Sequence, residues 1–295
     1  MKIKNWISKN CSRLDGKTIC ITGSTGGLAR EFTKTLASLG ANLIFANRNK
    51  EKSENQKQEL LKLFPNIKID IILVDLYNIN SVKLFVCKLK LKHVDTIIFN
   101  SAIYNVPRQT SSIGFDNIFQ VNFVSIYYIA KQMIPTLRKI KNSKIVFISS
   151  IAHEYSKVNF DDIQMLKNAK SSKIYGNSKR FAMFSLQKLL QDSSVELSVV
   201  HPGITLTNMT NHYPKAINWL VKLGIKILFP KPEKASLSII SGIYNSTKLN
   251  EWIGPAKFNI WGYPKKKNIN SASKEEINRI YLEAEKIYDA IQNNL

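Results

Sequence analysis

Tyr175 and Lys179 are the two side chains whose types and spacing most clearly indicate chemistry. They stand four residues apart in a segment with helical periodicity, so both project from one face of a helix. A phenol is a poor base near neutral pH, but a neighbouring ammonium group stabilises the phenolate and lowers its pKa. The pair therefore predicts general acid/base chemistry, with a solvated helix face as the alternative.

Two further residues support the chemical interpretation. Ser149 and Ser150 end an apolar run, where an open α/β sheet places its ligands and where a hydroxyl can donate to a substrate carbonyl. Asn122 lies in a long apolar helical segment, in which a buried amide needs several partners. A polar residue on the helix surface is the alternative for Asn122.

The elements that must position these residues alternate along the chain. Strand-like apolar runs are interleaved with helical patterns, which predicts an α/β fold with a doubly wound parallel sheet of about seven strands. The expected strands are residues 18–22, 42–46, 68–74, 96–100, 144–149, 196–200 and 258–261. The expected helices are residues 28–38, 50–63, 81–89, 115–138 and 174–191. No linker interrupts the series, so we expect a single domain over residues 1–295, with an N-terminal extension at 1–16.

A glycine-rich turn follows the first expected strand and opens the first expected helix. A pyrophosphate can approach the backbone closely at such a turn, where free N–H groups and the helix dipole favour an anion. A simple tight turn is the alternative, but the strand-to-helix context favours dinucleotide binding. The residues expected to bind are Gly23, Ser24, Thr25, Gly27 and Leu28.

The end of the second strand indicates which dinucleotide binds. An NAD site usually offers Asp or Glu there, but this sequence has Asn47 and Arg48. Arg48 can pair with a 2′-phosphate while Asn47 supplies neutral hydrogen bonds, so the sequence favours NADP(H) over NAD(H). An ordinary surface arginine is the alternative.

Composition and charge exclude several classes of protein. Among 295 residues, 44% are apolar and 22% are charged, which excludes extensive disorder. The net charge of +22 comes from lysines spread along the whole chain, so we expect no nucleic-acid partner. Cys11, Cys20 and Cys87 form no disulfide or metal pattern, and no apolar run reaches the length of a membrane span. These features predict a soluble cytoplasmic protein without a metal.

Residues 17–207 resemble the short-chain dehydrogenase/reductase superfamily, whose fold is of the Rossmann type. The cofactor turn of that family matches Thr22, Gly23 and Gly27, with Ala29 in place of its last glycine. Its acidic residue near the adenine matches Asp75, which Leu76 follows. Its Asn-Asn-Ala-Gly segment is represented by Asn100-Ser101-Ala102-Ile103.

The resemblance implies a role for each chemical residue. Asn122, Ser150, Tyr175 and Lys179 match the four catalytic positions, and Pro202, Gly203 and Thr207 match the loop that holds the nicotinamide carboxamide. Tyr175 and Lys179 also contact the cofactor by this resemblance. The separation of Ser150 and Tyr175, 25 residues, resembles the retinol dehydrogenase-like branch, as does Ala46-Asn47-Arg48-Asn49.

The implied reaction is hydride transfer between nicotinamide and a carbonyl or alcohol carbon, with Tyr175 moving the hydroxyl proton. Lys179 would bind the ribose, Ser150 would orient the carbonyl oxygen, and Asn122 would hold a water-linked proton path. A non-catalytic dinucleotide-binding sensor is the alternative. A Ser/His hydrolase is disfavoured because Ser150 lacks the glycine-flanked turn of such a nucleophile.

The last third of the sequence predicts a substrate lid and a tail helix. Residues 208–230 combine Trp219, Leu220 and Leu223 with a stripe of lysines, which fits a lid over an apolar substrate. Weak contact with an anionic membrane surface is the alternative role for this segment. At 268–295, Ser273 and Glu276 have capping-box spacing before an apolar helix face, which we expect to dock, with a free or partner-bound helix as the alternative. A homo-oligomer is a further expectation for the chain as a whole.

Overall fold

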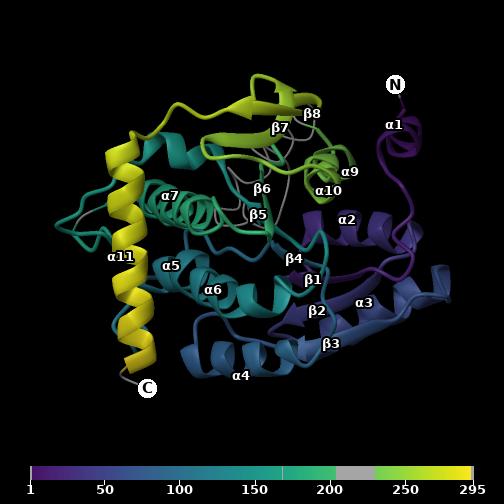
Figure 1. Ribbon diagram of the computed structural model, residues 1–295, viewed down its shortest axis with the longest axis horizontal. Helices are drawn as coiled ribbons and strands as arrows, with labels where there is room; N and C mark the ends of the chain where they lie inside the picture. Colours follow the sequence, from purple (N-terminus) through teal and green to yellow (C-terminus); the bar gives the residue numbers. More distant parts are fainter. Residues whose placement is uncertain (1, 168, 204–229, 294–295) are drawn as a thin grey trace, which may run out of the picture.

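Eight strands of the described residues form one sheet, in the order β3-β2-β1-β4-β5-β6-β7-β8 (Figure 1). The computed structural model describes residues 2–167, 169–203 and 230–293. Strands β1 to β7 pair in parallel, and β8 is antiparallel to β7. The strands are β1 (Thr18–Thr22), β2 (Asn42–Asn47), β3 (Ile69–Leu73), β4 (Thr96–Phe99), β5 (Lys144–Ile148), β6 (Glu196–Val200), β7 (Glu251–Lys257) and β8 (Trp261–Asn268).

Helices cover both faces of the sheet, which confirms the predicted doubly wound α/β fold. One face carries α4, α6 and α7, with α11 packed outside them, and the other carries α2, α3 and α10 (Figure 1). The helices are α1 (Ile3–Asn10), α2 (Gly27–Ser38), α3 (Lys50–Leu63), α4 (Ile79–Lys90), α5 (Asn117–Phe119), the π-helix η1 (Gln120–Val124), α6 (Ser125–Leu137), the 3₁₀-helix η2 (Ile151–Tyr155), α7 (Ser171–Leu189), α9 (Pro232–Ala235), α10 (Leu237–Tyr244) and α11 (Lys274–Asn293).

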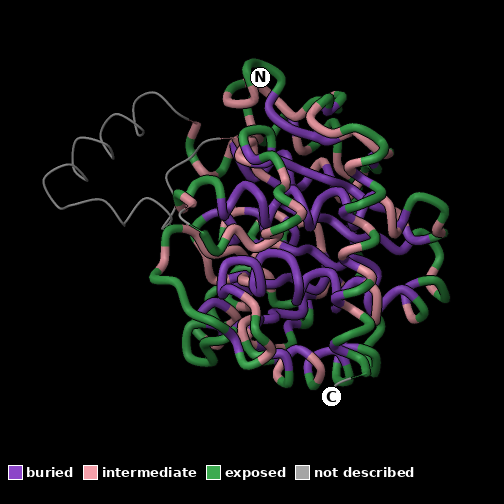
Figure 2. Tube along the Cα trace, turned by 90° about the vertical axis from the view of Figure 1, so that its left-hand side faces the viewer, coloured by how far each residue is buried: buried purple, intermediate pink, exposed green. Residues whose placement is uncertain are grey.

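Alternate side chains of the inner strands enter two apolar cores. In β1, Cys20 faces the core under α4, α6 and α7, whereas Ile19 and Ile21 face the core under α2 and α10. Successive side chains of a strand point to opposite faces, so a strand covered on both sides must be apolar throughout. Figure 2 shows this buried centre, with exposed residues in the turns and on the outer sides of helices.

The predicted strand at 258–261 is wrong, and the sheet has one strand more than expected. Phe258 and Asn259 have φ of 51° and 56° and lie in the turn between β7 and β8. The two strands themselves contain Pro255 and the lysines at 265–267, so neither has the apolar run of an inner strand. The lysines suit β8, which lies at the edge of the sheet, and Pro255 of β7 stands at a register shift between the two strands, where proline is tolerated.

The helix predicted at 115–138 is broken into three pieces. Asp116 caps α5 by accepting from the backbone N–H groups of Ile118 and Phe119. The chain then widens into the π-helix η1 before it continues as α6. A π-helical turn is rare and frequently marks a functional site. Here it contains Asn122.

Both ends of the chain pack against the sheet layers. The predicted extension at 1–16 contains α1, whose Trp6 is buried and stacks on Tyr263 of β8. The tail helix docks as expected through an apolar face that includes Ile277 and Ile280, but it begins at Lys274 rather than at 268, directly after Ser273, whose hydroxyl accepts from Glu276 N. Within the described ranges, no helix has the length and hydropathy needed to cross a bilayer.

Candidate active site

A cavity of about 1070 Å³ opens at the carboxyl ends of the central strands. The strand order reverses between β1 and β4, which is where doubly wound sheets bind ligands. Ser24 and Asn122 lie behind the cavity walls, and Thr207 lies outside the described residues. The predicted site residues that line the cavity are Gly23, Thr25, Gly27, Leu28, Asn47, Arg48, Asp75, Leu76, Asn100, Ala102, Ser150, Tyr175, Lys179, Pro202 and Gly203.

The glycine turn leaves space for a ligand against the start of α2. A Cβ built on Gly27 has no heavy atom within 4 Å, so the protein itself leaves that space open. Gly23 is needed for a different reason, because it has φ of +67° and its Cβ would lie 2.6 Å from the Ser101 hydroxyl. Gly26 is the N-cap of α2, and no side chain caps the helix. These free N–H groups beside open space fit a dinucleotide pyrophosphate.

A buried polar network holds the glycine turn from behind. The Asn47 amide accepts from Ser24 N (2.8 Å) and donates to the hydroxyls of Ser24 (2.8 Å) and Ser53 (2.9 Å). Gln56 donates to Ser24 O (3.0 Å) and to the Thr33 hydroxyl (3.1 Å). Asn47 and Ser24 therefore shape the turn, and their side-chain groups are engaged within the protein. Gln56 gave no sequence signal because it lies in a helix of mostly charged and polar residues.

One end of the cavity is positively charged. Arg48 lines it, is exposed, and makes no hydrogen bond or ion pair with another described residue. Lys52, in the first turn of α3, lines the same wall, and Asp75 is the acidic residue among the described lining residues. The Asp75 carboxylate accepts from Tyr77 N (3.0 Å). Lys52 was missed in the sequence, although it lies four residues after Arg48 and could have been identified by that spacing.

The predicted catalytic side chains converge at the other end. Ser150 follows β5 and caps η2 by accepting from Ala152 N (3.2 Å), and its hydroxyl lowers the pKa of the Tyr175 phenol. Tyr175 and Lys179 share one face of α7, with the Lys179 ammonium 5.9 Å from the Tyr175 ring centroid. Lys179 Nζ donates to Ile148 O (2.9 Å), at the end of β5. This geometry places a hydroxyl, a phenol and an amine on one wall of the cavity.

Burial shifts the pKa of Tyr175 and the pKa of Lys179 in opposite directions, because it disfavours the charged form of each group. It raises the pKa of Tyr175 to about 12, against the lowering effect of the Ser150 hydroxyl. It lowers the pKa of Lys179 to about 7, because an ammonium group loses its hydration inside the protein. The sequence predicts that Lys179 lowers the pKa of Tyr175. In the structure, burial raises that pKa instead.

Asn122 connects two walls of the site without lining the cavity. Its amide oxygen accepts from Ile103 N (2.8 Å), and its amide nitrogen donates to Ile103 O (2.9 Å) and to the Ser178 hydroxyl (3.1 Å). Ser178 lies next to Lys179 on α7. The π-helical turn thus places the buried Asn122 amide where it hydrogen-bonds both the loop after β4 and helix α7, which carries Tyr175.

The remaining predicted cofactor residues form the rim. Asn100 joins β4 to the glycine turn by donating to Thr22 O (3.1 Å) and Gly23 O (2.8 Å). Gly203 has φ of +86°, and a Cβ there would lie 3.1 Å from Pro255 Cγ, so this loop after β6 packs on β7. Pro202 precedes it in the cavity wall. These positions agree with a loop over the nicotinamide end of a dinucleotide.

A family comparison decides the class of this site. The family model for short chain dehydrogenases matches residues 17–218 of the chain. The chain belongs to the short-chain dehydrogenase family. "Short-chain dehydrogenase TIC 32 A, chloroplastic" of Brassica napus is 30% identical over 210 residues, which make up 66% of this chain and 66% of that protein. "Retinol dehydrogenase 13" of Mus musculus is 27% identical over 205 residues, 68% of this chain and 61% of that protein.

These relatives confirm the predicted resemblance to the retinol dehydrogenase-like branch, and the chain covers less than two thirds of the length of either.

Solved structures agree on the fold. An uncharacterised protein from Mycobacterium paratuberculosis superposes with a TM-score of 0.74 at 20% identity, covering 96% of this chain and 97% of that one. A short-chain dehydrogenase from Sphingobium yanoikuyae in complex with NADPH has a TM-score of 0.59 at 17% identity, covering 76% and 83%.

In this short-chain dehydrogenase the loop after β4 forms the wall facing Tyr175. The Tyr104 ring lies edge-on to the Tyr175 ring, with centroids 5.2 Å apart. Val106, Pro107 and Gln109 continue this wall of the cavity. Tyr104 was missed in the sequence, although it directly follows the matched segment 100–103. The wall that faces Tyr175 therefore combines the apolar groups of Tyr104, Val106 and Pro107 with the amide of Gln109.

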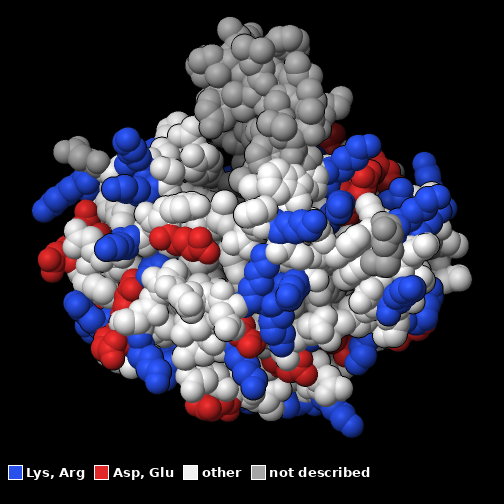
Figure 3. All heavy atoms as spheres, turned by 90° about the horizontal axis from the view of Figure 1, so that it is seen from above, with Lys and Arg blue, Asp and Glu red and all other residues white. Residues whose placement is uncertain are grey.

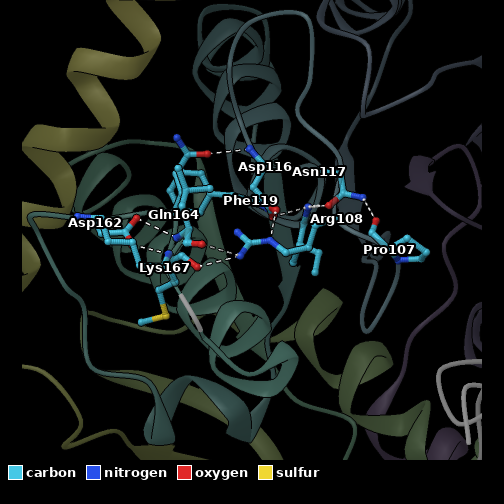
Figure 4. A network of polar contacts seen from close by, with 11 residues as sticks. Pro107, Arg108, Asp116, Asn117, Phe119, Asp162, Gln164 and Lys167 are labelled. Carbon is cyan, nitrogen blue, oxygen red and sulfur yellow. Dashed lines mark hydrogen bonds and ion pairs between the residues drawn. The ribbon is translucent and has the colours of Figure 1, made fainter.

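A polar network anchors this wall to the long segment between Ser150 and Tyr175 (Figure 4). Arg108 donates to the Asp116 carboxylate (2.9 Å) and to Met165 O (3.1 Å). Asp116 N donates to the Gln164 side-chain oxygen (2.7 Å), and Asn117 donates to Pro107 O (2.8 Å). The extra residues before Tyr175 are thus tied to the substrate wall.

Several expectations stay predictions. The predicted lid at 208–230, with its membrane contact, lies outside the described residues except for Pro230, and Thr207 also lies outside them. A homo-oligomer, a cytoplasmic location and the single-domain boundaries are likewise untested. Among the described residues, no group of three His, Cys, Asp or Glu side chains could hold a metal ion.

Proposed function

We propose that this short-chain dehydrogenase is an NADP(H)-dependent oxidoreductase acting on the carbonyl or alcohol group of an apolar substrate. The observation that carries the proposal is the convergence of Ser150, Tyr175 and Lys179 at one end of a cavity whose other end has an uncapped helix N-terminus and two cations. A single ligand with phosphates at one end and a reactive ring at the other fits the two ends of this cavity.

The chain's own residues would divide the reaction as follows. A bound NADP(H) supplies or accepts the hydride. Tyr175 keeps its phenolic proton at neutral pH, since burial raises its pKa to about 12, and gives that proton to the substrate oxygen during reduction. Ser150 orients the same oxygen with its hydroxyl. Lys179, held by Ile148 O, fixes the floor of the site and offers its remaining N–H groups to the cofactor ribose.

Arg48 and Lys52 support the proposed preference for NADP(H). Both line the end of the cavity that follows β2, where a 2′-phosphate would lie. Arg48 forms no ion pair with a described residue, so its guanidinium group is available for phosphate. The solved relative of the same fold from Sphingobium yanoikuyae contains NADPH.

An apolar alcohol or carbonyl compound is the proposed substrate class. Tyr104, Val106 and Pro107 line the cavity beside Tyr175, and their aromatic and aliphatic surfaces suit a substrate that is apolar around its reacting group. The curated relatives include a protein named retinol dehydrogenase 13, which fits an alcohol substrate.

Turnover by Tyr175→Phe tests the proposal. Carbonyl compounds of graded polarity would be assayed by loss of NADPH absorbance, and we expect the variant to lose at least about 10²-fold in kcat because it lacks the proton donor. NADPH affinity, measured by fluorescence titration, should change by less than about threefold. Tyr155→Phe is the matched control, since Tyr155 ends η2 and is 72% exposed.

Two results would contradict the assignment. Activity of Tyr175→Phe within about tenfold of the parent would remove the proton-donor role. NADPH binding without turnover of any compound would favour the non-catalytic sensor instead.

A further inference from the structure

Arg180 is a buried cation next to Lys179 that the reaction chemistry above does not use. Its side chain is 2% exposed. The guanidinium group donates two hydrogen bonds to the Glu276 carboxylate, at 2.8 and 2.7 Å, and one to His153 O at 3.0 Å. It also donates to Ser271 O. One side chain of α7 therefore joins η2 to the beginning of α11.

The η2 end of this connection leads directly to Ser150. His153 donates to Ser150 O through both its backbone N–H (3.2 Å) and its ring Nδ1 (2.6 Å). Ser150 Oγ in turn accepts from Ala152 N. The position of the His153 peptide thus fixes the turn that presents the Ser150 hydroxyl.

The other side of the same turn rests on α7 at Gly176. A Cβ on Gly176 would lie 2.2 Å from Ala152 O, so only glycine allows this close approach. Gly176 follows Tyr175, and Arg180 lies one helical turn further along on the same side. The segment from Ser150 to His153 is therefore held against α7 at two points, one beside Tyr175 and one at Arg180.

Glu276 completes the arrangement from α11. Ser273 Oγ accepts from Glu276 N (3.2 Å), which forms half of the predicted capping box. The Glu276 carboxylate pairs with Arg180, in a bidentate geometry that a lysine could not reproduce. A buried guanidinium that loses its carboxylate is strongly unfavourable, so Arg180 holds its orientation only while α11 is docked.

We propose that Arg180, with Glu276 as its counter-ion, is a positioning residue that sets the Ser150 hydroxyl in register with the Tyr175 phenol. Helix α11 is thereby a working part of the active site. The proposal deepens the proposed function and rests on it for its kinetic readout.

Glu276→Gln tests the proposal, with Glu285→Gln as the matched control. Glu285 also lies on α11, roughly 13 Å further along the helix, and pairs with a cation of α6, Lys131 (2.7 and 2.8 Å). Both glutamates are about equally exposed, at 24% and 27%. Both variants should lower the urea midpoint, and only Glu276→Gln should lower kcat.

We expect Glu276→Gln to lower kcat at least about tenfold while the KM and the NADPH affinity stay within about threefold, because misplaced catalytic groups cost rate rather than binding. Displacement of the Ser150 hydroxyl should also move the acid limb of alcohol oxidation to higher pH, since that hydroxyl lowers the pKa of Tyr175. The other groups facing Tyr175 are Tyr104 and Lys179, which the variant leaves in place.

Hydrogen exchange gives a readout that does not need turnover. The amides of Ala152 and His153 should exchange at least about tenfold faster in Glu276→Gln than in the parent and should be unchanged in Glu285→Gln. If the parent reduces no carbonyl compound, the proposed function fails and this comparison still decides the positioning role.

Arg180→Lys provides a second variant in case Glu276→Gln does not fold. Arg180→Lys keeps the positive charge but loses the bidentate guanidinium geometry. It should therefore reproduce the lower kcat and the faster amide exchange that we expect for Glu276→Gln. Either of two results would overturn the proposal. In the first, Arg180→Lys has the same kcat, pH profile and amide exchange as the parent. In the second, Glu276→Gln and Glu285→Gln change all three quantities equally.

Discussion

Burial, rather than the charge of Lys179, governs the proton on Tyr175. The sequence places an ammonium beside a phenol and predicts a lowered phenol pKa. In the fold both groups are buried, Lys179 donates to Ile148 O, and the pKa of Tyr175 rises to about 12. At neutral pH the phenol therefore carries its proton.

Arg48 and Lys52 give a prediction about cofactor choice. Arg48→Ala should weaken NADPH binding about 10- to 100-fold and leave NADH binding nearly unchanged, because a charge-assisted bond to the 2′-phosphate is lost. Lys52→Ala should act in the same direction with a smaller effect. Fluorescence titrations with both dinucleotides at fixed ionic strength measure the ratio of affinities.

Lys57→Ala is the control for net charge, because Lys57 lies on α3 but does not line the cavity. If Arg48→Ala weakens NADPH and NADH equally, its role is general attraction of phosphate and the preference must be sought elsewhere.

At the scale of elements, the sequence predicted what local pattern specifies. Strands β1 to β6 were found within one or two residues because β-branched and aromatic runs mark strands covered on both faces. The β7–β8 hairpin escaped, since its strands contain proline and lysines and its one apolar run, at 258–261, lies at the turn. β8 lies at the edge of the sheet and β7 pairs with β6 in register only at Val200 and Ile253, so both strands depend on partners that are not visible in the local sequence.

The site shows the same division. Ser150, Tyr175 and Lys179 were predictable because each follows a recognisable strand or helix signal. The packing of Asn122 was not, because a π-helical turn has no marker in the sequence and changes where a side chain points. Arg180 carries no marker in the sequence, and only the docking of α11 makes it a buried connection.

The network of Figure 4 carries a prediction for the substrate wall. Asp116 is buried, pairs with Arg108 and caps α5, so Asp116→Ala should lower the free energy of unfolding by about 3 kcal/mol. Gln164→Ala removes one hydrogen bond to Asp116 N and should cost about 1 kcal/mol. Both should raise the KM more than they lower kcat, because the network holds a wall of the cavity and not the reacting groups.

Urea unfolding and steady-state kinetics measure the two effects. Asp161→Ala, an exposed acid in the same segment, controls for the lost charge. An unchanged KM in Asp116→Ala would mean that the wall keeps its shape without this network.

At the scale of the whole molecule, the net charge of +22 is dispersed. On the face shown in Figure 3, lysine and arginine side chains lie across the whole surface with acidic and uncharged groups between them. A dispersed positive charge attracts anions without recognising the shape or the nucleotide sequence of a particular partner. The charge therefore adds to the attraction of a phosphorylated cofactor, and the absence of a nucleic-acid partner stays a prediction.

Two buried histidines link the stability of the whole fold to pH. Trp252 lies between them, stacked on His201 with centroids 4.8 Å apart and edge-on to His153 at 5.1 Å. Burial lowers the pKa of each to about 4, from an ordinary value of 6.5. His201 Nε2 donates to Asn259 O, so the neutral ring joins β6 to the turn of the β7–β8 hairpin.

The sign of the effect follows from proton binding. Between about pH 6.5 and pH 4 the unfolded chain binds protons at these histidines and the folded chain does not, so stability falls as the pH falls through that window. Each histidine contributes at most about 3 kcal/mol. Lys179, whose folded pKa is about 7, adds a rise in stability from pH 7 towards pH 10.5 for the same reason.

His201→Gln separates this contribution from that of the carboxylates, which lose stability over an overlapping range of pH. The variant keeps an amide donor but has no titrating ring, so it should be less stable than the parent at pH 7 and should lose about 1 to 3 kcal/mol less between pH 7 and pH 4.5. His93→Gln is the control, since the His93 side chain is 62% exposed. Urea unfolding at both pH values measures the difference, and a parental pH dependence in His201→Gln would show that this ring is not held neutral by the fold.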